Sequence, residues 1–579
     1  MRLRFAPGVD QLVHYDKAWL RGDVVAGITV AAYLIPQVMA YAELAGLPAV
    51  TGLWSVIGAM TVYALIGSSP QLSVGPESTT ALMTATAIGT VAASDPERHA
   101  ELAIVLAFVV AAMALVAFFA RLGFLADLLS KPVLIGYLAG VAVIMVAGQL
   151  DKFSGIEIDE DNPLRAIGHF LTHLDEIHTT TLLLSSCVLV FLIVGSWLMP
   201  RAPMPLIAIA LAAVVVEIFD LGARGVELVG SVPSGLPRPR APDLALADVK
   251  DLLLPAIGVT VVGYTDNALD GRAFANRNRY SIDSNQELLA LAGANAASGA
   301  LQGFPVSSSG SRTVIGDSLG SKSQLHSLVA VACVVITLLF LGPLLESFPR
   351  AALAALVVWA ATKLVDVPEL VRIGRFRASE LMLALATTAA VLIVDILYGI
   401  LVAIALSILD LLRRVARPHD GVLGYAPGVA GMHDIDDYPD AKQVPGLLVY
   451  RYDSPLFFAN AENFKKRALE SIADHAPIEW VLLNFEANVH IDLTSFDAVL
   501  ELLDELDERG ITLALARVKH DMEEQLAQAG LVERIGKDHI CETMPMAVQA
   551  YFEYYEGEHG EPPPGVVPPA PPEQPIIES

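Results

Sequence analysis

Residues 303–313 read Gly303-Phe304-Pro305-Val306-Ser307-Ser308-Ser309-Gly310-Ser311-Arg312-Thr313, a polar passage broken by glycine and proline between long apolar runs. If these runs span a bilayer, the arginine is expensive, because a central arginine costs about 2.5 to 3.5 kcal/mol on insertion scales. Non-helical backbone at that depth must face protein or a water-filled cavity. The passage therefore predicts a polar interior site rather than a lipid-facing helix.

The composition favours a membrane setting. Of the 579 residues, 54% are hydrophobic and only 17% are charged, and the mean hydropathy is +0.54. Soluble domains are rarely so apolar. The net charge of -26 comes largely from the last third of the chain and from predicted external loops. Since no basic nucleic-acid footprint is present, no nucleic-acid partner is predicted.

The residue types around Arg312 suit an anion. A helix beginning near Ser309 or Ser311 would point unpaired backbone N–H groups and about half a positive charge at an anion beside the guanidinium. Serine hydroxyls add further donors. Two alternatives stay open: Arg312 is structural and pairs with helix-end carbonyls, or the passage lies in a loop at the membrane surface.

The first long apolar segment is interrupted at Pro36. Proline removes a backbone hydrogen bond, and Gln37 and Tyr41 lie four residues apart on one helix face. That face is predicted to line a polar cavity. Equally consistent is a kinked span whose glutamine bonds a neighbouring helix.

A second broken segment reads Gly75-Pro76-Glu77-Ser78-Thr79-Thr80. Like the passage at Arg312, it has glycine, proline, hydroxyls and one charge at the start of a short apolar segment. Paired interrupted segments in corresponding halves of a chain point to the binding site of an inverted-repeat transporter. Glu77 and Ser78 therefore join the candidate binding residues. Chance similarity is the alternative, because such patches are common in membrane helices.

The apolar segments number about fourteen, and several are shorter than the ~20 residues that a full span needs, as expected for half-helices. Basic residues before the first segment and in alternate loops place both chain ends in the cytoplasm, in a plasma-membrane protein. No cleavable signal precedes the first segment. The segments are 24–44, 53–66, 80–93, 101–120, 126–149, 181–199, 203–219, 252–270, 287–303, 310–320, 323–343, 348–363, 378–394 and 396–412.

Asp266 lies within one of these segments, where a bare carboxylate is expensive. It is expected to be protonated, bound to a cation or paired with an arginine. In the first two cases, neutralisation by H⁺ or Na⁺ would let an anion approach Arg312. The alternative is a fixed Asp266–Arg312 ion pair that joins two helices. Glu77 would compete with the anion for a positive helix end, or would itself carry the proton.

Motifs for enzymatic chemistry are weak. Residues 316–320 match G-x-S-x-G, but no buried strand precedes them, as that motif requires. No H-E-x-x-H, Walker-type or G-x-G-x-x-G motif occurs. The cysteines, Cys187, Cys333 and Cys541, are too scattered for a disulfide framework or a zinc site. The sequence therefore predicts no catalytic residue, metal or cofactor.

The chain changes character after Arg417. We expect a cytoplasmic N-terminus at 1–22, a transmembrane domain at 23–417 and a polar linker at 418–445. A soluble α/β domain at 446–555 and a disordered Pro-rich tail at 556–579 follow. The expected strands of the α/β domain are 447–452, 480–485 and 512–517, and its expected helices are 461–474, 495–508, 519–529 and 544–555.

From about residue 23 to 555 the sequence resembles the SulP family of anion permeases, the sulfate transporter family. The resemblance rests on several motifs in order. They are Ala26-Gly27-Ile28-Thr29-Val30-Ala31, Ile35-Pro36-Gln37-Val38-Met39-Ala40-Tyr41-Ala42, Val74-Gly75-Pro76, Ala273-Phe274-Ala275, Asn285-Gln286-Glu287-Leu288, Phe304-Pro305-Val306-Ser307 and Ser311-Arg312-Thr313.

This resemblance implies a membrane all-α domain of about fourteen segments in two inverted repeats of seven, forming core and gate domains, with a cytoplasmic α/β STAS domain behind it. It also implies a homodimer. The anion would sit between the starts of the third and tenth segments, in contact with Gln37, Tyr41, Ser311 and Arg312. Asp266 matches the acidic position implicated in H⁺ or Na⁺ coupling.

Glu77 departs from the family pattern, since many relatives have alanine or an apolar residue there. Its presence leaves the anion and the coupling ion open.

In the soluble domain, Ile491-Asp492-Leu493-Thr494-Ser495 resembles a STAS loop in which related bacterial regulators are phosphorylated on serine. Thr494 occupies that position, which makes it a candidate regulatory residue. The alternative is that Asp492 and Thr494 only cap the following helix.

Taken together, these features predict a secondary-active transporter of inorganic oxyanions, sulfate first, coupled to protons, and not an enzyme. A transporter of the same fold for bicarbonate with Na⁺, or for a dicarboxylate, is the nearest alternative. An anion channel or a membrane-tethered signalling protein are alternatives from other classes.

Overall fold

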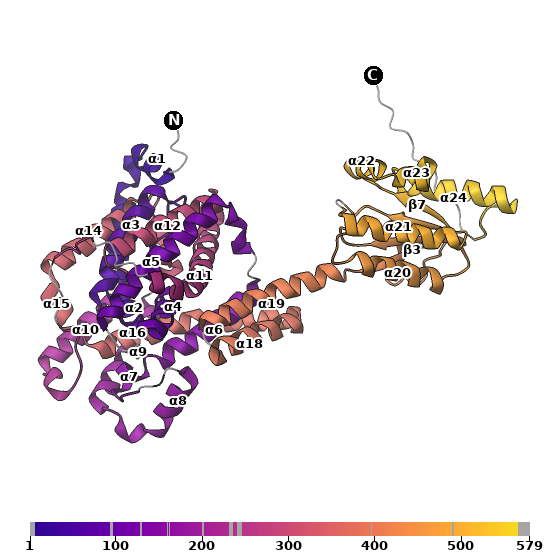
Figure 1. The fold of residues 1–579 in the computed structure, drawn as a ribbon. Helices are drawn as coiled ribbons and strands as arrows, with labels where there is room; N and C mark the ends of the chain where they lie inside the picture. The colour runs from indigo at the N-terminus through magenta and orange to yellow at the C-terminus, as the bar shows by residue number, and fades with distance from the viewer. Residues whose placement is uncertain are drawn as a thin grey trace. The chain divides into compact units, whose positions relative to one another are not determined.

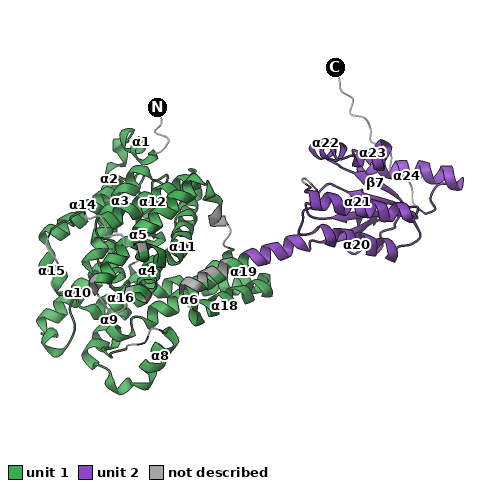
Figure 2. Ribbon diagram, viewed as in Figure 1, with its two compact units in different colours: residues 1–407 green, residues 408–579 purple. Residues whose placement is uncertain are grey.

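The computed structural model describes residues 6–565, apart from 93–95, 128–129, 159, 161, 200–201, 231–234, 240–245, 395 and 489–490. The chain divides into two compact units, Met1–Ser407 and Ile408–Ser579 (Figure 2). Unit 1 is helical, whereas unit 2 combines a sheet with helices (Figure 1). The predicted tail residues 566–579 lie outside the described residues.

Unit 1 contains two groups of helices, which we call the core group and the gate group. In the core group, α2 packs on α3, α13 and α14, while α12 and α11 pack on α5. Its bounds are α2 Leu20–Leu44, α3 Val50–Ile66, α4 Ser78–Ala92, α5 Pro96–Phe119, α11 Leu246–Asn278, α12 Ser284–Ala300, α13 Gly310–Ser318 and α14 Leu325–Phe340. The short helix α1, Pro7–Val13, packs on α3.

In the gate group, α16 packs on α6 and α9, and α18 packs on α6. Helix α2 also contacts α16 and α10, so it lies where the two groups meet. The bounds are α6 Lys131–Ala147, α7 Leu150–Ser154, α8 Pro163–Thr172, α9 Thr179–Leu198, α10 Met204–Ile218, α16 Arg350–Leu364, α17 Val367–Phe376 and α18 Ala378–Ile393. The short helix α15, Gly342–Glu346, packs on α14, and α19, Ile396–Ala416, continues from unit 1 into unit 2.

Each apolar segment predicted from the sequence coincides with one helix of this unit. Among the described residues, five helical stretches are long and apolar enough to cross a membrane: Lys17–Leu44, Arg98–Phe119, Thr179–Leu198, Ala247–Asn278 and Arg350–Phe376. Five more apolar helices are shorter, with 10–17 residues each: α3, α6, α10, α14 and α18. Large side chains such as Trp197, which is 81% exposed, point outward, as lipid-facing residues do.

Two details of unit 1 differ from the expectation. The region 151–180, expected to be a loop, holds most of α7 and all of α8. Helix α8 is short and amphipathic, so a search for long apolar runs does not find it. Helix α11 extends to Asn278 rather than ending near 270, because its polar last two turns carry no hydropathy signal.

The two broken segments meet in a short two-stranded ladder. Strand β1, Val74–Gly75, pairs antiparallel with β2, Ser307–Ser308, and the paired residues are Val74 with Ser308 and Gly75 with Ser307. Helix α4 begins soon after β1 and α13 soon after β2. Two interrupted helices therefore start side by side inside the core group.

Unit 2 is built on a six-stranded sheet in the order β4-β3-β5-β6-β7-β8. Strands β5 to β8 are parallel, and β3 and β4 extend the sheet antiparallel. One face carries α20 and α21 with Phe464 and Leu502 in its core, and the other carries α24 with Tyr551. The bounds are β3 Asp420–Tyr425, β4 Met432–Asp434, β5 Gly446–Tyr452, α20 Ala461–Asp474, β6 Ile478–Asn484, α21 Leu493–Glu508, β7 Thr512–Ala516, α22 His520–Gln528, α23 Leu531–Ile535, β8 Ile540–Cys541 and α24 Met544–His559.

The region 418–445, expected to be a linker, contains β3 and β4 and so belongs to the sheet. Val422 and Leu423 are buried there against β5. The strands are short and rich in glycine and aspartate, which weakens their sequence signal. The parallel strands and the helices between them agree with the sequence prediction within a few residues, whereas β8 and α23 were not expected.

Candidate functional site

The backbone around the two helix starts is fixed by side chains from neighbouring helices. The amide of Val306 donates to Asn295 Oδ1 at 2.9 Å, and Asn295 Nδ2 donates to the Val306 carbonyl at 3.2 Å. Across the ladder, Ser309 N donates to Ser73 O at 2.9 Å and Ser73 N to Thr313 Oγ1 at 3.0 Å. Buried non-helical backbone is thus satisfied by protein groups, as a membrane interior requires.

Arg312 stands in the first turn of α13 and is completely buried. Its Nη1 donates to the Pro76 carbonyl at 2.9 Å and to Gln37 Oε1 at 3.3 Å. Its Nε and Nη2 are buried and have no hydrogen-bond partner in the described part of the chain. A guanidinium with two unsatisfied donors is prepared for a bidentate oxyanion.

The start of α13 is also open. Its N-cap residue, Ser309, makes no side-chain capping bond, so the helix end offers N–H groups and partial positive charge beside Arg312. Of the alternatives kept from the sequence, a membrane-surface loop conflicts with the burial of Arg312. Nor does any ion pair join Arg312 to Asp266 among the described residues, so a fixed pair between them is not formed.

Gln37 and Tyr41 lie on one face of α2, as their spacing predicts. Gln37 Nε2 donates to Tyr41 Oη at 3.0 Å while its Oε1 accepts from Arg312. Both side chains are buried. The two residues therefore form a polar wall beside the guanidinium.

Glu77 occupies the start of α4. Its Oε2 accepts from Ser78 Oγ at 2.8 Å, from Thr79 N at 2.9 Å and from Thr79 Oγ1 at 3.2 Å. A carboxylate thus already caps the positive end of this helix. Ser78, predicted as an anion donor, gives its hydroxyl hydrogen to Glu77 instead.

Asp266 and Glu77 both contact the hydroxyl of Thr79. Thr79 Oγ1 is 3.3 Å from Asp266 Oδ2, and Ser307 Oγ donates to the same oxygen at 3.5 Å. The hydroxyls that hold Asp266 thus come from both broken segments, Thr79 from α4 and Ser307 from β2.

The sequence analysis missed Asp270, although it follows Asp266 by four residues on the same helix, which is the available signal. Ser308 Oγ donates to Asp270 Oδ2 at 2.7 Å. A Cβ on Gly310 would lie 3.0 Å from Asp270 Oδ1, so this carboxylate stands at the start of α13. Three carboxylates and one guanidinium therefore surround the helix starts, and ionised carboxylates there would repel an anion.

A cavity of about 340 Å³ leads to this site. It is lined by Thr29 and Tyr33 of α2, by Ser311 and Ser318 of α13, and by residues of α9, α10 and α16. Ser311 is exposed in it, whereas Arg312 beside it is buried. Lys363 is the only charged residue among the described lining residues, so the cavity favours anions. Tyr33 was not predicted, although it lies four residues before Gln37.

Thr494 lies in the first turn of α21 in unit 2 and is exposed. Asp492 is the N-cap, with its Oδ1 accepting from Ser495 N at 2.9 Å and from Ser495 Oγ at 2.8 Å. Asp492 therefore caps the helix without Thr494. The Thr494 hydroxyl is not needed for the cap.

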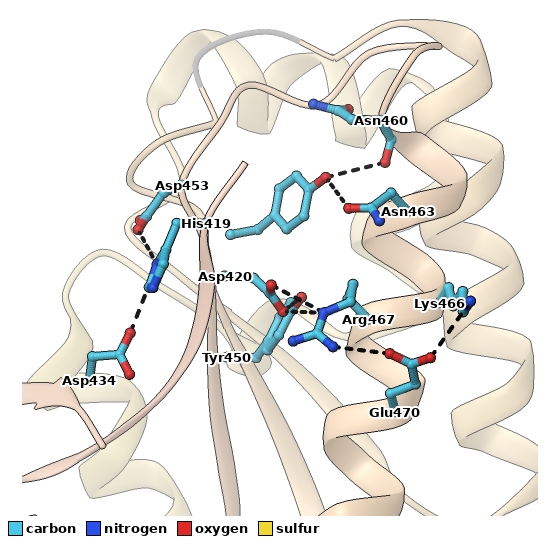
Figure 3. A network of polar contacts seen from close by, with 11 residues as sticks. His419, Asp420, Asp434, Tyr450, Asp453, Asn460, Asn463, Lys466, Arg467 and Glu470 are labelled. Atoms are coloured by element: carbon cyan, nitrogen blue, oxygen red, sulfur yellow. Dashed lines mark hydrogen bonds and ion pairs between the residues drawn. The ribbon is translucent and has the colours of Figure 1, made fainter. Parts of the chain in front are cut away.

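The same unit holds a polar network between β3, β5 and α20 (Figure 3). Arg467 Nε donates to both carboxylate oxygens of Asp420, at 3.2 and 3.1 Å, and Tyr450 Oη donates to Asp420 at 2.8 Å. Burial, and then the bond to Asp420, raises the pKa of the Tyr450 hydroxyl above its usual range. The hydrogen bond to Asp420 also raises the pKa of Arg467. The network ties the first strand of the sheet to a covering helix.

Two broken helices that meet at a buried arginine, in a helical membrane unit followed by an α/β unit, define an anion-transport protein of the SLC26/SulP fold with a STAS domain. Residues 20–387 match the family model of the Sulfate permease family, and residues 438–547 match that of the STAS domain. The chain belongs to the sulfate permease family. It is a multi-pass membrane protein of a transporter family and not an enzyme.

Among curated relatives, the chain is 52% identical over 549 residues to the "Probable sulfate transporter Rv1739c" of Mycobacterium tuberculosis, covering 94% of this chain and 98% of that one. It is 32% identical to "Sulfate transporter 4.1, chloroplastic" of Arabidopsis thaliana, covering 93% of this chain and 81% of that one. These relatives and the family model confirm the resemblance drawn from the motifs.

Solved structures show the same fold. SLC26A9 matches with a TM-score of 0.86 at 22% identity, covering 96% of this chain and 94% of that chain. The transmembrane domain of the cyanobacterial bicarbonate transporter BicA matches with a TM-score of 0.59 at 20% identity, covering 68% of this chain and 98% of that chain. The expected membrane domain with a C-terminal α/β STAS domain is thereby confirmed.

Proposed function

We propose that this protein is a secondary-active transporter that moves sulfate across the membrane together with a cation, H⁺ first. The observation that carries the proposal is Arg312, whose Nε and Nη2 remain unpartnered at the open start of α13. An oxyanion there would receive guanidinium and backbone N–H donors in place of its hydration shell. Gln37, Tyr41 and Ser311 complete the substrate site. The curated relatives named above carry sulfate transport in their names, which supports this substrate.

Coupling follows from the carboxylates beside that site. A dianion approaching Glu77 and Asp266 is repelled until cations neutralise them, so anion and cation bind together. We assign Asp266 the coupling role, because it is held by hydroxyls of both broken segments. Glu77, which caps α4, is both a neighbour of the substrate and a second candidate carrier.

Uptake of labelled sulfate into proteoliposomes tests the substrate assignment. Under an inward proton gradient the parent protein is expected to accumulate sulfate, and Arg312→Ala to abolish the accumulation. Arg165→Ala, at an exposed arginine of α8, serves as the matched control. Accumulation by Arg312→Ala equal to that of the control would remove the site assignment.

The coupling assignment has its own test. Asp266→Asn is expected to bind sulfate but to lose the dependence of uptake on the driving cation, since its side chain no longer changes charge. Gradients of H⁺ and Na⁺ are imposed separately, with sulfate, bicarbonate and a dicarboxylate as cargo. Sulfate uptake by Asp266→Asn with the parent's cation dependence would refute the assignment. Na⁺-driven bicarbonate or dicarboxylate uptake by the parent would favour the nearest alternative.

Orientation and assembly complete the proposal. The basic loops support termini in the cytoplasm, and the family resemblance supports a homodimer in the plasma membrane. The exposed Thr494 supports phosphorylation as a regulatory input to the STAS domain. Protease access to the C-terminal unit in sealed vesicles, cross-linking in the membrane, and uptake by Thr494→Ala and Thr494→Glu variants test these three points in turn.

A further inference from the structure

Helices α2 and α16 border a cavity along part of their length and are joined by charge at one end. In the middle of α2, Thr29 and Tyr33 line the cavity that leads to Ser311, and Trp359 and Lys363 of α16 line its other side. The rings of Tyr33 and Trp359 lie 6.3 Å apart, centroid to centroid. Fourteen residues along α2 from Thr29, Glu43 reaches Arg350 at the opposite end of α16, and Arg350 Nε lies 3.6 Å from Glu43 Oε1. The core and gate groups therefore border the cavity on one side and are bridged by charge at the opposite end of α16.

Several features make the contact at Glu43 specific. The Glu43 side chain is 9% exposed, so its charge depends on a partner. Lys152 Nζ of α7 adds a second contact from the gate group, at 3.5 Å from the Glu43 carbonyl oxygen. That carbonyl belongs to the last turn of α2, where the helix dipole is negative and cations are favoured. Two cations of the gate group thus hold one helix end of the core group.

Arg350 is itself fixed within the gate group. Its backbone N donates to the Glu227 carbonyl at 3.0 Å, and its Nη1 lies 3.2 Å from Glu227 Oε2. The neighbouring residues also pair, since Val229 N donates to the Phe348 carbonyl at 2.9 Å. Arg350 and Glu227 therefore move as one piece, and a separation of the groups at this face must break the contacts of Arg350 and Lys152 with Glu43.

We propose that Glu43, Arg350 and Lys152 form a latch that closes the face opposite the cavity and holds the transporter in the conformation described here. Tyr41, a substrate-site residue, lies two residues before Glu43 on α2, so release of the latch displaces the site as well. A second cavity of about 340 Å³, lined by Lys152 and Arg350 among others, gives water access to the latch from that face. The inference rests on the proposed transport function, but its test uses no substrate.

The test reports which face is open. A cysteine-free background is made with Cys187→Ser, Cys333→Ala and Cys541→Ala, and Ser318→Cys then reports the open cavity through its rate of maleimide labelling in detergent. Breaking the latch with Glu43→Gln or Arg350→Gln is expected to slow labelling about three- to tenfold, because the cavity-open conformation loses population. Glu176→Gln, at an exposed carboxylate away from the latch, is the control and is expected to leave the rate unchanged.

The charge-swapped pair Glu43→Arg with Arg350→Glu, made together with Glu227→Gln so that no second carboxylate faces position 350, is expected to bring the labelling rate back toward that of the parent. If a single variant does not fold, the swapped pair decides: recovery of both fold and rate supports the latch, and a folded pair that labels slowly overturns it. Labelling by both Gln variants at the control rate overturns it too. If the labelling results are as expected but the parent protein takes up no sulfate, the proposed function is contradicted and the latch is not.

Discussion

In Arg312, Nη1 donates to two acceptors, whereas Nε and Nη2 have no hydrogen-bond partner among the described residues. This imbalance favours the proposed anion-binding role of Arg312 over a structural role, because a structural arginine in a dry interior has its donors satisfied. The carboxylates of Glu77, Asp266 and Asp270 lie around the same two helix starts as this guanidinium. The site thus combines one guanidinium with several carboxylates, and the proposed coupling assigns the change of charge to the carboxylates.

Glu77→Gln is expected to raise sulfate affinity about tenfold, because it removes a negative charge next to the divalent anion. The uncharged amide still accepts hydrogen bonds from Ser78 and Thr79, so the start of α4 keeps its cap. Binding is measured by calorimetry on the purified protein. Glu176→Gln, at an exposed position, is the control, and weaker binding by Glu77→Gln would show that the carboxylate assists the anion.

Much of the residue set could be read from the sequence, because an arginine and two Gly-Pro passages stand out among apolar runs. The hydrogen-bond partners of these residues could not be read from the sequence. Pro76 contributes through its backbone carbonyl, which any residue possesses. For Asp270 and Tyr33 the sequence offers only a spacing of four residues from Asp266 and from Gln37, and their positions near α13 come from the packing of α11 and α2.

At the scale of helices, the site depends on close approach between α2 and α3. A Cβ on Gly52 of α3 would lie 2.0 Å from the carbonyl oxygen of Val38, which directly follows Gln37 on α2. Small residues permit such contacts between membrane helices. Gly52 therefore sets the position of the helix that carries Gln37 and Tyr41.

Gly52→Ala is expected to destabilise the protein by about 1 to 3 kcal/mol, since the added methyl group forces two backbones apart. It should also weaken sulfate binding, because Gln37 shifts with α2. Gly89 of α4 is the matched control, since a Cβ there meets nothing within 4 Å and alanine is the better helix former. Thermal melts and sulfate titrations of both variants check this, and equal behaviour would contradict it.

Most helix positions followed from hydropathy, because most of the apolar runs are continuous even where they are short. Helix α8 and strands β3 and β4 escaped detection, since α8 is amphipathic and the strands are short and glycine-rich. The pairing of β1 with β2 joins residues more than two hundred positions apart and has no local signal. Only the similarity of the two broken segments pointed to it.

At the scale of the whole molecule, the contacts separate into two units with different sources of stability. In unit 1, Asp23 is fully buried, and its carboxylate accepts from Lys322 N at 2.7 Å and from Ser323 Oγ at 2.6 Å. It thereby ties α2 to the turn before α14. In unit 2, the Asp420–Arg467 pair ties β3 to α20.

The two units are expected to unfold in separate thermal transitions of the full-length protein, because cooperative unfolding follows the contact clusters. Asp23→Ala should lower only the transition of unit 1, by about 2 to 4 kcal/mol, since it leaves several buried donors unsatisfied. Arg467→Ala should lower only the transition of unit 2, by about 1 kcal/mol, because its side chain is 46% exposed and water screens the pair.

Controls keep the assignment of each transition specific. Asp16→Ala removes only a cap at Ala18 N near the start of α2, and Lys466→Ala removes an exposed neighbour of Arg467 that lies 3.8 Å from Glu470. Both are expected to cost about 1 kcal/mol or less. Sulfate should shift the transition of unit 1 alone, because every proposed ligand-binding residue lies there. A single transition lowered by both Asp23→Ala and Arg467→Ala would mean that the STAS domain and the membrane helices unfold as one cooperative body.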